Sequence, residues 1–366
     1  MEHYSVLIAG AGPAGSMAAR YADLPGRVLV VDKDDLQDPS LEKCCGGLLN
    51  EKAQETLSAL GLCVPGDVLA SPQVFVIRAI DLDNRKERYY PKHYVNIRRG
   101  AFDRYLRKEA GKNPAVEFAG KTTLADFTPH PDGVEAVLRK EDGSLVTVTA
   151  DYLVGADGAG SFVRRALQEK LAGPDEPDYP IRRYVALQRR YKTEEELPYF
   201  IALFDQNVTD YYSWVIPKDG FLLCGSALPS DKEARKRFER FIEDLKEAGV
   251  PLGEPVSEQG CRMFRPYGPE SVHTGRGRVF LAGEAAGFVS PSSEEGISYA
   301  LKSGSRLGKA LSEAKSPDEA AGRYRRSMAC EIGGMAVRHI KGKIMYGPTL
   351  RGLVFRTGAL SIRRQP

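Results

Sequence analysis

The sequence predicts an α/β (α+β) fold with a Rossmann-like first domain and a second domain built on a mostly antiparallel sheet. An apolar run at residues 4–9 is followed by a glycine-rich turn, a helical stretch at 16–24 and another apolar run at 27–31. Buried parallel strands have this composition, so the segment predicts a βαβ unit. A similar run at 279–283 indicates that the first domain is assembled from segments far apart in the sequence.

The antiparallel elements are predicted from their turn residues. Asp-Gly pairs at 132–133 and 142–143 divide residues 131–154 into alternating strands, which favours a three-stranded meander. A linker rich in Pro and Asp is expected at 173–180. The strand-like runs that predict the second sheet follow it, at 185–191, 198–204, 213–216 and 221–227.

One clear amphipathic helix is expected after these strands. Ser230 and Glu233 have the spacing of a capping box at its start, and Gly249 is suited to end it. The apolar side chains that would share its buried face are Phe238, Phe241, Ile242 and Leu245.

The composition excludes several classes of protein. The chain has 366 residues, of which 42% are hydrophobic and 28% charged, with a net charge of +3. This mild charge argues against a nucleic-acid partner. We find neither a signal peptide nor an apolar run of about 18 residues, so we expect a cytoplasmic protein. The six cysteines lack metal-ligand spacing, so we expect reduced thiols and no metal site.

The glycine-rich turn carries the first chemical prediction. Gly10 would form the tight turn, Gly12 would let the backbone approach a pyrophosphate, and Gly15 would allow close packing of helix on strand. Pro13 and Ala14 lie between these glycines, where the helix begins and its free N–H groups can bind phosphate. The turn therefore predicts a dinucleotide site.

An acidic residue supports this interpretation. Asp32 ends the second strand, with Lys33 after it, and is placed to accept hydrogen bonds from a ribose hydroxyl. The alternative is a turn that uses glycine for packing alone. The strand, the helix and the acid occur together, which favours nucleotide binding.

Three further segments resemble the group A flavoprotein monooxygenase superfamily. Residues 155–164 (GADGAGSFVR) resemble its second FAD signature and include Asp157. Residues 279–288 resemble the third, with Gly283 and with Glu284 in place of the usual Asp. Residues 96–103 resemble its R-x-x-F-D element, with Arg99 as the arginine. The resemblance implies FAD as cofactor, and a FAD-binding domain of the glutathione reductase/p-hydroxybenzoate hydroxylase type.

The loop after the third signature departs from the family pattern. The family usually has P-x-x-G-x-G there, whereas this chain has Pro291, Ser292, Ser293, Glu294, Glu295, Gly296 and Ile297. Glu294 therefore stands where a glycine would let the backbone approach the flavin. The resemblance still implies cofactor contacts from Pro291, Glu294, Gly296 and Ile297.

Within this superfamily the chain is similar to the geranylgeranyl reductase group, and to its bacterial Cbr-type subgroup. The group's K-P-C-G-G element matches residues 43–47, with Cys44 in place of proline, and its Y-x-W-x-F-P-K element matches residues 212–218. The resemblance implies reduction of carbon–carbon double bonds in an isoprenoid or similar apolar substrate. It also implies that Cys45, Gly46 and Gly47 lie against the flavin, with Cys45 as proton donor and cofactor contact.

Several alternatives stay open at this point. Cys44 and Cys45 could be small packing residues, and Tyr212 and Trp214 could line the substrate cavity or fill a core. A hydroxylase, a halogenase or a non-catalytic flavin sensor would use the same scaffold. We find no second G-x-G-x-x-G, so the electron donor could be NAD(P)H or a ferredoxin-like carrier.

The C-terminal segment is basic. Between 323 and 366 ten Lys or Arg stand against one acid, Glu331. A peripheral membrane contact suited to a lipid substrate is one interpretation, and a helical cap packed on the flavin domain is the other. The predicted divisions are a FAD-binding domain at 1–72, 96–172 and 272–330, a substrate domain at 73–95 and 173–271, and a helical segment at 331–366.

Overall fold

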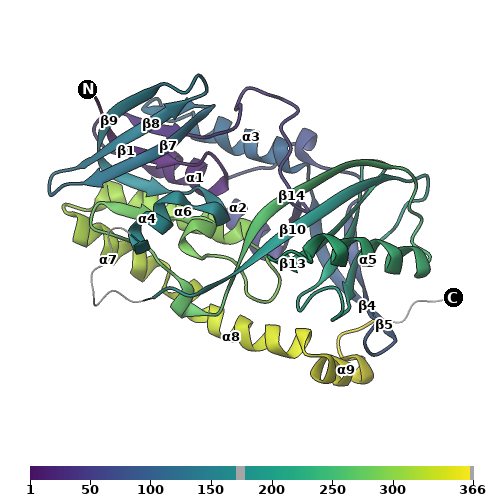
Figure 1. The fold of residues 1–366 in the computed structure, drawn as a ribbon. Coiled ribbons are helices and arrows are strands. Elements are labelled where there is room, and N and C mark those ends of the chain that lie inside the picture. Colours follow the sequence, from purple (N-terminus) through teal and green to yellow (C-terminus); the bar gives the residue numbers. More distant parts are fainter. Residues whose placement is uncertain (170–177, 363–366) are drawn as a thin grey trace.

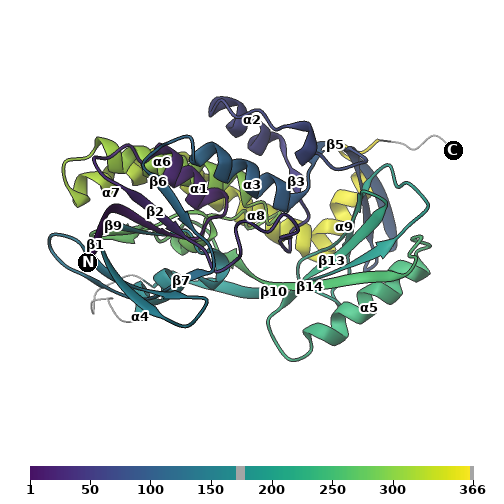
Figure 2. The same cartoon turned by 90° about the horizontal axis from the view of Figure 1, so that it is seen from above.

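The computed structural model describes residues 1–169 and 178–362. Two sheets lie toward opposite ends of the molecule, and the long strands β10 (Ile181–Lys192) and β14 (Pro255–Pro266) run between the two ends (Figures 1 and 2). Most of the predicted linker, residues 173–177, lies outside the described residues.

The first sheet is largely parallel, in the order β15-β16-β9-β1-β2-β6. Neighbouring strands from β16 to β6 all pair in parallel, so β16 joins the sheet far from its sequence neighbours, as predicted. The strands are β1 (Glu2–Ala9), β2 (Val28–Val31), β6 (Val116–Ala119), β9 (Leu145–Gly155), β15 (Gly275–Arg276) and β16 (Val279–Leu281). The predicted meander is confirmed: β7 (Thr122–Pro129) and β8 (Val134–Lys140) pair antiparallel, and β8 pairs with β9.

Helices pack around this sheet. Helix α1 begins three residues earlier than predicted and also ends earlier, because Pro13 already fits the first helical turn. Helix α6 packs along α1, and Gly304 and Gly308 allow this because side chains there would strike the α1 backbone. The helices are α1 (Pro13–Tyr21), α2 (Glu51–Ala59), α3 (Arg99–Ala110), α4 (Phe162–Glu169), α6 (Ile297–Glu313) and α7 (Pro317–Ser327).

The second sheet is mostly antiparallel, as predicted, in the order β14-β10-β13-β12-β11-β4-β5-β3. Within this second sheet, β11 and β4 are the only neighbouring strands that pair in parallel among the described residues. Strand β3 falls inside the predicted first domain but extends this sheet by pairing with β5. The remaining strands are β3 (Leu48–Leu49), β4 (Val74–Asp81), β5 (Lys86–Asn96), β11 (Phe200–Phe204), β12 (Ser213–Lys218) and β13 (Phe221–Pro229).

Helix α5 (Ala234–Glu247) covers one face of the second sheet with its predicted apolar residues buried. The predicted capping box is wrong, because the helix begins after Glu233 and no side chain caps it. Instead, the Asp231 carboxylate accepts the Glu233 N–H at 2.9 Å in the preceding turn. Gly249 ends the helix as predicted, with a left-handed φ of +71°.

The C-terminal segment is helical, as predicted, and forms α8 (Ala329–Tyr346) and α9 (Pro348–Thr357). The cap extends further than predicted: Met335 of α8 packs into the core of the first domain, whereas α9 packs on β5 of the second sheet. Its Arg351 is fully buried and pairs with Asp81 at 2.9 Å and Asp83 at 2.5 Å. None of the helices in the described ranges is both long and apolar enough to cross a bilayer.

Candidate functional site

The glycine-rich turn joins β1 to α1 and is shaped by close backbone contacts. A Cβ at Gly10, whose φ is +106°, would lie 2.3 Å from the carbonyl oxygen of Ala156. A Cβ at Gly15 would lie 1.8 Å from that of Gly10. In contrast, a Cβ at Gly12 would meet no described atom within 4 Å. The fold thus requires Gly10 and Gly15, whereas Gly12 faces open space at the start of α1.

Asp32 lies beside this turn, immediately after β2. Its carboxylate accepts the N–H of Ala11 at 2.7 Å and that of Asp34 at 3.0 Å. It therefore holds the turn in place in addition to the ribose contact predicted for it. Lys33 is exposed.

The second and third signatures meet the first one here. A Cβ at Gly283 would lie 2.8 Å from the Cβ of Ala14 in α1. Asp157 Oδ2 accepts the N–H of Phe162 at 2.7 Å, while Oδ1 is buried and finds no partner in the described structure. Burial raises the pKa of Asp157. A buried oxygen without a partner is rare in proteins and fits a ligand that donates a hydrogen bond.

Glu284 connects the third signature to the second sheet. Its Oε1 accepts the N–H of Phe264, in β14, at 3.0 Å. Burial raises the pKa of Glu284 to about 7. The side chain is therefore an acceptor at the junction of the two sheets, and its charge changes near neutral pH.

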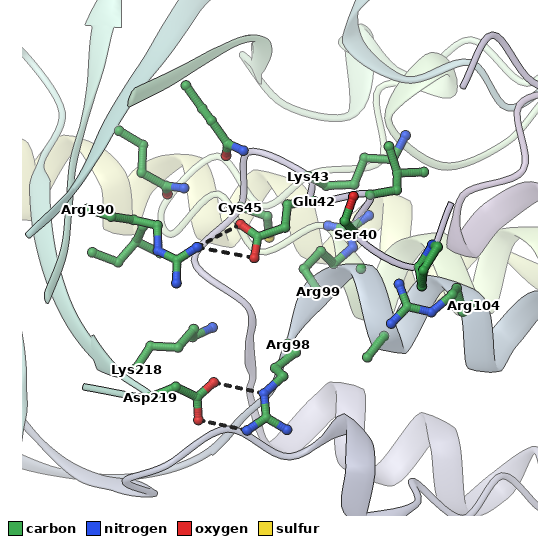
Figure 3. Close-up of a pocket in the computed structure, with 17 residues that line it drawn as sticks. Ser40, Glu42, Lys43, Cys45, Arg98, Arg99, Arg104, Arg190, Lys218 and Asp219 are labelled. Carbon is green, nitrogen blue, oxygen red and sulfur yellow. Dashed lines mark hydrogen bonds and ion pairs between the residues drawn. The ribbon is translucent and has the colours of Figure 1, made fainter. Parts of the chain in front are cut away.

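A cavity of about 270 Å³ opens between the Cys45 loop, the start of α3 and the second sheet. Figure 3 shows Cys45, Arg99 and Lys218 in its lining, with ion pairs joining Glu42 to Arg190 and Arg98 to Asp219. The structure thus brings together two predicted site residues, Cys45 and Arg99, from segments about fifty positions apart in the sequence.

Arg99 is held by its own helix. Its Nε donates to Asp103 Oδ1 at 2.8 Å. Burial lowers the pKa of Arg99, but the Asp103 carboxylate and the neighbouring Cys45 sulfur outweigh burial, so the pKa stays above its usual value. A permanent positive charge therefore lies beside the Cys45 thiol.

Lys218 holds the Cys45 loop from the other side. Its Nζ donates to the carbonyl oxygens of Gly46 at 2.7 Å and Ile97 at 2.6 Å. Burial lowers its pKa to about 8. Gly47 has a φ of +63°, and a Cβ there would lie 2.5 Å from this Nζ. Lys218 was not among the predicted site residues, although it ends the 212–218 motif, which carried the signal.

Trp214 and Tyr212 do not line this cavity. They belong to an apolar cluster on the face of the second sheet away from α5, and Cys44 and Leu48 pack against the same cluster. Trp214 lies opposite Gly225 on β13, where any Cβ would be 2.4 Å from the indole ring. The indole Nε1 is buried and has no partner among the described residues.

The loop at 290–297 covers this apolar cluster and leads into α6. Tyr212 Oη donates to the carbonyl of Ser293 at 3.2 Å, and Tyr346 Oη donates to that of Ser292 at 2.8 Å. Tyr346 is the last residue of α8, and no sequence pattern pointed to it. Pro291, Gly296 and Ile297 belong to the same loop and to the first position of α6.

Glu294 is the unusual residue of this loop. It has a φ of +52°, which fits the glycine of the family pattern. Its Oε1 is buried and finds no partner within the described part of the chain. Burial raises the pKa of Glu294 well above its usual value, which favours the neutral form of the carboxyl group. The loop therefore places a carboxyl group with a raised pKa near the tyrosines.

Comparison with known proteins decides the family. A family model described as an FAD binding domain matches residues 3–323. The chain belongs to this family. It is also similar to the protein CbrA of Escherichia coli K12, with 36% identity over 368 residues that cover 99% of each chain. FAD is therefore the cofactor, and the protein is a member of the FAD-dependent oxidoreductase and monooxygenase superfamily.

Solved structures share the fold. A geranylgeranyl bacteriochlorophyll reductase-like protein from Thermoplasma acidophilum has a TM-score of 0.81 at 21% identity, covering 98% of this chain and 92% of its own. The flavin-dependent halogenase CmlS has a TM-score of 0.67 at 19% identity, covering 96% and 68%. These likenesses confirm the fold of the p-hydroxybenzoate hydroxylase type and leave the reaction open.

The described residues fit FAD. The open space at Gly12 and the N-terminus of α1 suit the pyrophosphate, because free N–H groups gather there. The partnerless oxygen of Asp157 suits a hydroxyl donor of the cofactor. The charge of Arg99 reaches Glu284, and Arg99 also lies beside Cys45. The individual contacts predicted for these residues remain predictions.

Proposed function

We propose that this protein uses FAD to reduce carbon–carbon double bonds in an isoprenoid or similar apolar substrate. The observation that supports this most is the position of the Cys45 loop. Lys218 holds the loop between the cavity that contains Arg99 and the apolar cluster around Trp214. A polar cofactor-binding side and an apolar substrate-binding side therefore meet at Cys45, Gly46 and Gly47.

Each group has a separate role in the proposed reaction. FAD, when bound and reduced, would supply a hydride equivalent to one carbon of the double bond. The Cys45 thiol donates a proton to the other carbon as a general acid, and the thiolate that remains takes up a proton from solvent. The aromatic side chains around Trp214 and Tyr212 bind the apolar chain and exclude water. Gly46 lets the loop pack closely on β12, because a Cβ there would lie 2.6 Å from Ile216.

The test is anaerobic. The flavin is reduced by light, which avoids any choice between NAD(P)H and a ferredoxin-like donor. Isoprenoid lipids of different head groups are then added, and the flavin absorbance is followed together with the product mass. We expect substrate-dependent reoxidation and a product heavier by two hydrogens. If no polyunsaturated isoprenoid reoxidises the flavin faster than buffer, the proposal is wrong.

Hydroxylation or halogenation is the second candidate, because the halogenase CmlS shares the fold. Mixing the reduced protein with oxygen separates the two functions. A hydroxylase or halogenase would stabilise an oxygen adduct of the flavin that is visible by stopped-flow absorbance. A reductase would reoxidise without it. A non-catalytic flavin sensor would show neither this adduct nor any reoxidation that depends on substrate.

A further inference from the structure

The two C-terminal helices expose an unusual amount of apolar surface. Seven of the twelve large hydrophobic side chains that are exposed in the described residues lie between 337 and 362. Single exposed apolar side chains are common, but a gathered group marks an interaction site. Helices α8 and α9, which carry five of the seven, lie along one edge of the molecule (Figure 1).

On α8 the exposed apolar residues form one stripe. Val337, Ile340 and Ile344 are spaced by three and four positions, so they share a helix face. Val337 is 69% exposed and Ile340 is 59% exposed. Met335 and Tyr346 are buried and lie on the opposite side of the helix. The stripe therefore faces away from the rest of the protein.

Helix α9 repeats this arrangement. Arg351 and Phe355 are buried against the second sheet, whereas Leu350 and Leu353 are 47% and 52% exposed. Leu350 and Leu353 are three positions apart and lie on the side away from the buried pair. Both helices thus combine one anchored face with one apolar face that no described residue covers.

The charge around these stripes is positive. From 332 to the end of the chain the sequence has no acidic residue. Lys341, Lys343 and Arg356 are exposed beside the stripes, and none of them forms an ion pair with the residues that the structure describes. The positive charges of Lys92 and Arg338 lie near Lys341 as well. Like charges gathered in this way favour an anionic partner.

We propose that the exposed face of α8 and α9 docks on the surface of a bilayer containing anionic lipids. An apolar face flanked by lysine and arginine is the arrangement of helices that lie in the membrane interface. The anionic head groups would neutralise the lysines, and the stripes would enter the boundary of the acyl chains. Docking does not depend on the proposed reaction, although Tyr346 would connect the docked helix to the loop over the site.

The experiment measures co-sedimentation of the full chain, with FAD bound, with two kinds of vesicle. One kind contains phosphatidylcholine alone and the other includes phosphatidylglycerol. We expect binding to the anionic vesicles that weakens as salt is added, because salt screens the lysines. Failure of the parent protein to bind anionic vesicles at low salt would overturn the proposal.

Two sets of variants test whether vesicle binding uses the exposed face of α8 and α9. The double variant Ile340→Glu/Leu353→Glu should lose binding, whereas Leu145→Glu, at a 60% exposed position on β9, should bind like the parent. Lys341→Gln/Lys343→Gln should weaken binding about fivefold for each lysine. Lys232→Gln/Lys236→Gln, a matched pair at exposed positions, should leave vesicle binding unchanged.

FAD content and thermal unfolding confirm that each variant is folded. Equal losses in the matched controls would overturn the proposal, since they would show that the face is not specific. Light scattering adds a further test. The parent protein could be a dimer that Ile340→Glu/Leu353→Glu converts to a monomer. That result would also overturn the proposal, because the apolar face of α8 and α9 would then bind a second copy of the chain.

Discussion

The two ends of the site are built in different ways. Around Gly10, Gly12 and Gly15 the fold relies on close backbone contacts, and of these three positions only Gly12 faces open space. Around Trp214 and Glu294 it relies on side chains from distant segments, and both residues have a buried polar atom without a partner among the described residues. We therefore expect substitutions at the first end to change cofactor binding, and those at the second end to change chemistry and pH dependence.

The largest effect is expected where the two ends meet. Cys45→Ser should leave FAD bound but lower substrate-driven reoxidation of the flavin by about 100-fold or more, because general acid catalysis contributes on that scale. A hydroxyl group is a much weaker acid than a thiol. The measurement is the anaerobic reoxidation rate together with the flavin content of each protein.

The matched control for this variant is Cys44→Ser. Cys44 packs against the second sheet, where the Cys261 thiol donates to its carbonyl at 3.5 Å, so Cys44 has a packing role of its own. We expect Cys44→Ser to react at the parent rate. Equal losses in both variants would show that the loop needs its shape and not the Cys45 thiol.

Next in size is an effect on cofactor affinity. Gly12→Ala adds a Cβ that meets no described protein atom, so the unfolding temperature of the protein without FAD should not change. FAD affinity should fall at least tenfold, about 1.4 kcal/mol, if the pyrophosphate occupies that space. Calorimetric titration measures it, and Gly66→Ala, also in open space but far along the chain, serves as the control. Unchanged affinity in Gly12→Ala would place the cofactor elsewhere.

Much of the first end could be predicted from the sequence, and much of the second could not. Gly15 and Asp32 contact the turn itself, at Gly10 and Ala11, so their spacing alone shows the requirement. Tyr346 approaches the Ser292 carbonyl from 54 positions away, and Cys261 meets Cys44 from 217 positions away. No local pattern encodes such contacts, because they depend on how two sheets and a C-terminal helix pack together.

Local misreadings have a similar cause. The capping box at Ser230 has the right spacing, but Asp231 organises the turn first and the helix begins four residues later. Glu294 could be recognised as a departure from the family glycine. Its raised pKa follows only from the packing of the tyrosines and the second sheet around it. A motif thus fixes where a residue stands in the chain, while its environment fixes its chemistry.

An effect on stability is expected from the lysine that holds the Cys45 loop. Lys218→Met removes two hydrogen bonds from a charged group to the carbonyls of Gly46 and Ile97. Leaving buried acceptors without donors costs about 1–3 kcal/mol each, so the free energy of unfolding should decrease by a few kcal/mol. Chemical denaturation measures it. Lys232→Met, at an exposed position, should leave the free energy of unfolding almost unchanged. An equal decrease in both variants would argue against the stabilising role of the Lys218 hydrogen bonds.

The most diagnostic effect is on pH dependence. Because the folded protein raises the pKa of Glu294 above its unfolded value of 4.5, this group favours folding fully only below that pH. As the pH rises above 4.5, the unfolded chain releases the proton first. Glu294 therefore lowers the free energy of unfolding by up to about 1.4 kcal/mol per pH unit until its folded pKa is reached. Glu284 acts in the same direction up to its pKa of about 7.

Glu294→Gln should remove one of these two contributions. Compared with the parent, the variant should gain stability at pH 8 relative to pH 5, measured by chemical denaturation at both values. The exposed Glu247→Gln serves as the control and should leave the pH dependence unchanged. If Glu294→Gln shows the parent's pH dependence, Glu294 is charged in the folded protein. The substrate end would then resemble the cofactor end, where the Asp32 carboxylate accepts hydrogen bonds from two backbone N–H groups.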